Sequence, residues 1–113
     1  MNVRTSHVGD VVVVHVSEPR LTYPMLSEFA TVTAGLINKG EAKVVIDLAA
    51  VGYVDSATIG CLMDLYRQAE AAGGTLKLAG VQKRVETMLT MTGAQNFLEV
   101  HADQASALAS FGA

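Results

Sequence analysis

The chain has 113 residues and a mass of 11.9 kDa, which suits one domain spanning residues 1–113. Half of its residues are apolar and 17% are charged, which excludes a disordered chain, and the net charge of −3 without a basic cluster argues against a nucleic-acid partner. Apolar runs such as Val11–Val14 are far shorter than the roughly 20 residues that span a bilayer. The first residues lack the order of a secretion signal, and the single Cys61 fits a reducing compartment. We therefore expect a cytoplasmic protein without direct membrane insertion.

The first third of the chain predicts a hairpin followed by a helix. Val3–Val8 and Val11–Val16 are β-branched runs on either side of Gly9-Asp10, which is typical of a two-residue hairpin turn. A proline-containing loop over residues 19–24 follows. Apolar residues then recur at three- and four-residue steps and indicate one buried helical face before Asn38-Lys39-Gly40 ends the helix. These residues are Leu26, Phe29, Ala30, Thr33, Leu36 and Ile37.

The rest of the chain alternates short apolar runs with helical patterns. Residues 44–48 and 76–79 are typical of buried parallel strands, and residues 97–100 predict a last short strand. A loop over residues 49–55 precedes a second helix that begins near Ser56. A third helical face runs from residue 81 to Gly93, and Asp103 is placed to cap a small final helix. The predicted order is β-β-α-β-α-β-α-β-α, which indicates an α/β sandwich with a mixed, mostly parallel sheet.

No motif for metal, cofactor or nucleophilic chemistry is found in the sequence. The three histidines are scattered, and neither a CxxC nor an HxxxH spacing occurs. Phosphate-binding and dinucleotide-binding glycine loops are absent, and Ser56 lacks the flanking glycines of a nucleophile elbow. Cys61 is better explained as a small apolar residue than as a redox group. We therefore expect no enzymatic activity, no cofactor and no metal.

Asp55 and Ser56 form the most informative pair in the chain. They follow a strand and a short loop and stand where the second helix is expected to begin. The simplest interpretation is that one of them caps the helix, because a side-chain oxygen there accepts a hydrogen bond from an unpaired backbone N–H.

Between Val44 and Phe97 the chain contains Val45-Ile46-Asp47-Leu48, then Val54-Asp55-Ser56, and later Thr92-Gly93. With these segments, this stretch resembles the STAS domain family, the anti-sigma-factor antagonists of bacteria. Several separate segments agree with the family in order and spacing. The N-terminal half fits too, with residues 12–14 and 18–21 standing where the second strand of the family and its following loop occur. The matching segments are Val45-Ile46-Asp47-Leu48, Val54-Asp55-Ser56, Ile59-Gly60, Ala72-Gly73-Gly74-Thr75-Leu76, Leu78-Ala79-Gly80-Val81 and Thr92-Gly93.

The resemblance implies a STAS-like fold and a non-enzymatic antagonist that binds an anti-sigma factor with serine-kinase activity. In the family, the serine directly after the aspartate is phosphorylated by that kinase, and this position is Ser56 here, with Asp55 supporting it. The unphosphorylated form binds the kinase and frees a sigma factor. Because the first loop and the start of the second helix should lie at the same end of the sheet, we expect one partner-binding surface there. It comprises Arg20, Thr22, Tyr23, Thr58 and Ile59 beside Ser56. Core packing is the alternative for Tyr23 and Ile59, since Ile59 also falls on the apolar face of the second helix.

Two other functions stay open. Thr22 stands where the family usually has an acid. Thr58 stands where it usually has a glycine and would narrow the approach of a partner backbone. Both favour a STAS interaction module that is not switched by phosphate, such as an accessory subunit that binds the ABC-type ATPase of a lipid transporter, or a signalling scaffold. An enzyme or small-ligand binder is the third alternative, and no residue cluster in the sequence supports it.

Overall fold

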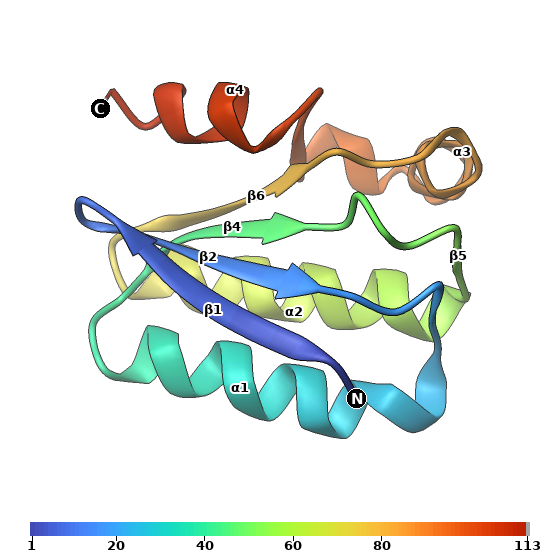
Figure 1. Cartoon of the computed structure of the whole chain (residues 1–113), viewed down its shortest axis with the longest axis horizontal. Coiled ribbons are helices and arrows are strands. Elements are labelled where there is room, and N and C mark those ends of the chain that lie inside the picture. Colours follow the sequence, from blue (N-terminus) through green and yellow to red (C-terminus); the bar gives the residue numbers. More distant parts are fainter. Residues whose placement is uncertain (113) are drawn as a thin grey trace.

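The computed structural model describes residues 1–112, and its centre is a five-stranded sheet in the order β1-β2-β4-β6-β7 (Figure 1). β1 and β2 pair antiparallel, whereas β2–β4, β4–β6 and β6–β7 are parallel. The expected α/β fold with a mixed, mostly parallel sheet is confirmed. The strands are β1 (Val3–Val8), β2 (Val11–Val16), β4 (Lys43–Asp47), β6 (Thr75–Ala79) and β7 (Glu99–His101).

Helices cover both faces of this sheet, but unequally. α1 (Leu26–Asn38) and α2 (Ser56–Ala71) run side by side along one face, and the short α4 (Gln104–Ala109) lies on the opposite face (Figure 1). α3 (Lys83–Thr92) connects β6 to β7. Short 3-10 turns, η1 (Tyr23–Met25) and η2 (Ala94–Asn96), precede α1 and follow α3. No helix within residues 1–112 is long and apolar enough to cross a membrane.

Strand alternation divides the apolar residues of the sheet between two clusters. Val12 and Val14 of β2 point into the main core with α1 and α2, whereas Val11 and Val13 point to the face under α4. All four valines are at most 1% exposed. A strand buried on both faces is continuously apolar, which is why β2 lacks the alternation of a half-exposed strand.

The structure contains a second, very small sheet in segments that the sequence indicates as loops. β3 (Arg20–Leu21) pairs in parallel with β5 (Tyr53–Val54). This pair fastens the loop after β2 to the loop after β4, just before α2 begins. The last strand also differs from the prediction: it starts at Glu99, and Phe97 is 59% exposed in the turn after η2.

Candidate functional site

Ser56 is the first residue of α2, and its side chain is exposed. Asp55 precedes it with extended backbone angles (φ −101°, ψ 176°) and is the N-cap of the helix. Because the N–H groups of the first helical turn have no intrahelical partner, the Ser56 hydroxyl stands at the positive end of a 16-residue helix. The expected position of this pair at a helix start is confirmed.

Asp55 uses both carboxylate oxygens to join two separate segments. Oδ1 accepts hydrogen bonds from the Thr58 backbone N–H at 2.9 Å and the Thr58 hydroxyl at 2.7 Å. Oδ2 accepts a bond from the Tyr23 backbone N–H at 2.9 Å, across 32 residues of sequence. Burial alone would raise the pKa of this carboxyl, but the bonds from Thr58 and Tyr23 outweigh that effect and hold the pKa below its usual value. The side chain is therefore an anionic tie between η1 and α2.

The prediction that Thr58 and Ile59 lie on the partner-binding surface is wrong for their side chains. Thr58 is 0% exposed and Ile59 is 4% exposed. The Thr58 hydroxyl proton has two acceptors, the Leu21 carbonyl and Asp55 Oδ1, each 2.7 Å from the hydroxyl oxygen, so the hydroxyl is satisfied inside the site. Ile59 packs in the main core. Because Thr58 faces inward, it does not narrow the approach of a partner as the sequence suggested.

Arg20 and Tyr23 are exposed near Ser56, as expected. The β3–β5 pairing sets Arg20 opposite Tyr53, and the Arg20 guanidinium lies 4.4 Å from the centre of the Tyr53 ring. Tyr23 is 73% exposed and is held by the backbone bond to Asp55. Thr22 is half-buried and contacts the sulfur of Met25 at 3.9 Å. The accessible part of the site is therefore a cation, an aromatic ring and a hydroxyl at one end of the sheet.

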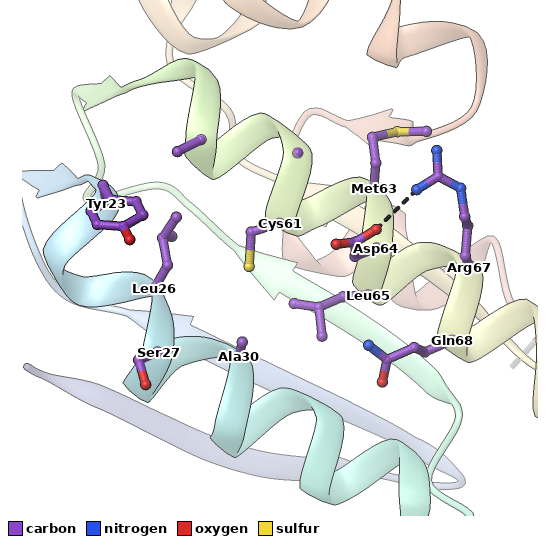
Figure 2. A pocket seen from close by; sticks show the side chains of 12 residues that line it. Tyr23, Leu26, Ser27, Ala30, Cys61, Met63, Asp64, Leu65, Arg67 and Gln68 are labelled. Carbon is purple, nitrogen blue, oxygen red and sulfur yellow. Dashed lines mark hydrogen bonds and ion pairs between the residues drawn. The ribbon is translucent and has the colours of Figure 1, made fainter.

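A groove of about 690 Å³ continues from this site between α1 and α2 (Figure 2). Tyr23 and Leu26 lie on its α1 side, and the Cys61 side chain points from α2 toward α1 (Figure 2). Burial raises the pKa of the Cys61 thiol, with a further contribution from Asp64, so the thiol is neutral near pH 7. The groove is mixed in character, because the ion pair of Asp64 with Arg67 at 3.0 Å borders its far part.

The amino-acid sequence matches a known protein family. The model of the STAS domain family matches residues 2–107. The chain therefore belongs to the STAS domain family, and the resemblance seen in the sequence is confirmed. A Thermotoga neapolitana protein described as a candidate anti-sigma factor antagonist, a homolog of TM1081, is 26% identical over 65 residues. That alignment covers 58% of each chain, so it spans less than two thirds of the relative.

Solved structures agree on the fold over almost the whole chain. A candidate anti-sigma factor antagonist of Thermotoga maritima superposes with a TM-score of 0.86 at 22% identity, covering 96% of this chain and 92% of the other. The anti-sigma factor antagonist SpoIIAA in its unphosphorylated form gives a TM-score of 0.83 at 16% identity, covering 98% and 96%. The phosphorylated form of SpoIIAA from Bacillus gives 0.75 at 15% identity, covering 97% and 99%.

Proposed function

We propose that this STAS domain is an anti-sigma factor antagonist that binds an anti-sigma factor with serine-kinase activity and is switched off by phosphorylation of Ser56. The observation that carries the proposal is the exposed Ser56 hydroxyl on the first residue of α2, directly after the capping Asp55. The relatives support the same role, because SpoIIAA is described as an anti-sigma factor antagonist and has both unphosphorylated and phosphorylated forms.

The partner-binding surface is proposed to consist of Arg20, Tyr23 and the first turn of α2. Tyr23 presents a large exposed ring and Arg20 a cation, which are residue types enriched in the energetic centres of interfaces. Tyr23 is also held in place by its bond to Asp55, so little backbone ordering is needed on binding. Thr22 belongs to the rim of this surface.

Phosphate on Ser56 would act through charge. It adds about −1.5 to −2 charges beside the Asp55 carboxylate, which is already anionic because its pKa is lowered. A partner surface complementary to the unmodified hydroxyl would then face a bulky anion, and like-charge or unpaired-charge contacts cost several kcal/mol. A cost of about 3 kcal/mol weakens binding roughly a hundredfold, which suffices for a switch.

The test uses the serine-kinase anti-sigma factors encoded in the same genome. Each purified kinase is incubated with the chain and ATP, and the product is analysed by mass spectrometry. We expect one added phosphate on Ser56 and none on Ser56→Ala. Binding to the same kinase should persist in Ser56→Ala and weaken about a hundredfold in Ser56→Asp. Absence of phosphate on Ser56 with every such kinase would refute the switch.

Affinity capture with the unmodified chain separates this function from an unswitched STAS module. Recovery of an ABC-type ATPase in place of a sigma-regulating kinase would favour the accessory subunit of a lipid transporter. Thr22 still favours the unswitched module, because the family usually has an acidic residue at this position. Thr58 no longer supports it, because its side chain is buried.

A further inference from the structure

The face of the sheet that carries α4 also carries a row of polar side chains that α4 leaves open. α4 covers Val11, Val13 and Val45 near the start of β2 and the middle of β4. Further along the same face, the His15 and Asp47 side chains stay 21% and 20% exposed. Ser6 of the neighbouring β1 is also only partly buried. These residues lie on the opposite face from the main core and take no part in the Ser56 site.

Strand register brings these three side chains into contact. His15 pairs with Asp47 across the parallel strands β2 and β4, and His15 Nδ1 lies 3.3 Å from Asp47 Oδ2. His15 Nε2 lies 3.0 Å from the Ser6 hydroxyl on the antiparallel strand β1. The other carboxylate oxygen, Asp47 Oδ1, accepts the Ala49 backbone N–H at 3.0 Å and fixes the carboxylate. The contacts therefore run serine, histidine, aspartate in order.

We propose that Ser6, His15 and Asp47 form a nucleophilic site that hydrolyses carboxylic esters carrying a negative charge. A hydroxyl in contact with one imidazole nitrogen, and a carboxylate beside the other, are the nucleophile, general base and orienting group of serine acyl transfer. The three residues come from three different strands. Such a site is recognised by its geometry, because no local sequence motif brings these residues together.

Arg4 is the reason for proposing an anionic substrate, because its cationic side chain lies next to the three residues. This residue stands two positions before Ser6 on the same strand, so both side chains point to the same face, and Arg4 pairs directly with His15. Arg4 is exposed and, with His15 and Asp47, lines a hollow of about 130 Å³. The guanidinium is the group placed to bind an acid group of the substrate.

The reaction balances without a further reactant except water. The Ser6 Oγ forms a bond to the ester carbonyl carbon, and its proton passes to His15 Nε2. The ester C–O bond breaks, and the departing alkoxide takes that proton from His15. Water then attacks the acyl-serine carbon, and His15 accepts its proton and returns it to Ser6 Oγ as the acid product leaves.

The test uses the full chain with mono-p-nitrophenyl succinate, which is anionic, and p-nitrophenyl acetate, which is neutral. Release of p-nitrophenolate is followed by absorbance, and the acylated residue is located by mass spectrometry. We expect acylation of Ser6, turnover beyond one equivalent, and a higher kcat/KM for the succinate ester. Ser6→Ala should abolish acylation at this position, and His15→Asn should slow it at least tenfold. A release that stops at one equivalent would overturn the hydrolytic second step.

Further variants separate the roles of the neighbouring residues. Arg4→Gln should raise KM for the anionic ester by a larger factor than KM for the neutral ester. Asp47→Asn should lower kcat at unchanged KM, as a positioning residue does, and circular dichroism checks that it folds. Ser27→Ala is the matched control, because Ser27 is an exposed serine on α1 far from these strands in sequence. Equal labelling of Ser6 and Ser27 by a fluorophosphonate, or labelling of Ser6 indifferent to His15→Asn, would overturn the proposal.

Discussion

Removal of the Asp55 carboxylate is the sharpest test of how the Ser56 site is built. In Asp55→Ala, the N-cap bond to the Thr58 N–H, the bond to the Thr58 hydroxyl and the bond to the Tyr23 N–H are lost together. The Thr58 hydroxyl keeps a second partner, the Leu21 carbonyl, so it is not left unpaired. The main losses are therefore the helix cap and the link to η1.

The expected cost follows from these two losses. An aspartate N-cap replaced by alanine costs about 0.5–2 kcal/mol. A hydrogen bond to a charged group contributes about 1.5–3 kcal/mol, toward the lower end where water replaces it, as at Tyr23. We expect Asp55→Ala to lower the free energy of unfolding by about 2–4 kcal/mol. A domain of this size has about 5–15 kcal/mol, so the variant should still fold.

Two further variants separate the contribution of the helix cap from that of the link to Tyr23. Urea denaturation measures the stability of each. Asp103 caps α4 through the Ser106 N–H at 2.8 Å and, within residues 1–112, accepts no hydrogen bond from a second segment, so Asp103→Ala should cost only about 0.5–2 kcal/mol. Asp55→Asn keeps a cap oxygen but turns an amide donor toward Tyr23, which isolates the link. If Asp55→Ala costs no more than Asp103→Ala, the tie between η1 and α2 has no energetic value and the reasoning fails.

The same tie predicts a pH dependence. The pKa of folded Asp55 lies below its ordinary value of 3.8, so the ionised form stabilises the fold at pH values above that ordinary pKa. The contribution is lost as pH falls through the lowered pKa, because both states are then protonated. The difference in unfolding free energy between wild type and Asp55→Ala should be constant above about pH 5 and shrink below 3.8. A difference that grows with acid would contradict this sign.

Four further substitutions test the packing and the switch. Urea denaturation measures the stability of each variant, and a binding titration with the partner measures the effect of the last one. Gly74→Ala should cost about 1–3 kcal/mol, because a Cβ there would clash with the backbone carbonyl of Ala42. Gly60→Ala should instead stabilise the chain by about 1 kcal/mol, since a Cβ at this exposed helical position meets no atom of residues 1–112 within 4 Å. Phe29→Ala should cost about 3–5 kcal/mol, because the ring is 0% exposed in the main core. Ser56→Asp should change stability by less than about 1 kcal/mol while weakening partner binding.

The main elements could be predicted because their signals are local. The turn at Gly9-Asp10 and the apolar run of β2 appear directly in the sequence, and the hairpin and its strand bounds are confirmed. The β3–β5 pair could not be predicted, since two-residue strands have no periodicity and depend on a partner about 30 residues away. The short apolar pattern predicts a strand that includes Phe97, but the turn after η2 places this residue in solvent.

The position of Ser56 could be predicted from the sequence, whereas the orientations of most residues around it could not. A helix start after Asp55 has a chemical signature in the side chain that caps it, so Ser56 could be located. Helical periodicity already indicates a buried face that includes Ile59, and the partner-surface prediction for this residue is contradicted by that burial. Thr58 could not be assigned from periodicity, because its hydroxyl is buried against the Leu21 carbonyl of a distant loop. The link from Asp55 to Tyr23 and the contacts of His15 with Ser6 and Asp47 arise only from tertiary register.

The arrangement around Ser56 explains how a phosphate could change binding without changing the fold. Asp55 already accepts the Thr58 N–H, which leaves the N–H groups of Ser56 and Ala57 without an intrahelical partner at the positive helix end. A phosphate on Ser56 would meet this favourable field and, at the same time, repulsion from Asp55. Because the two effects oppose each other within the folded chain, their net effect on stability is small. The proposed partner surface, if complementary to the unmodified hydroxyl, offers no such compensation, so most of the electrostatic cost would fall on binding.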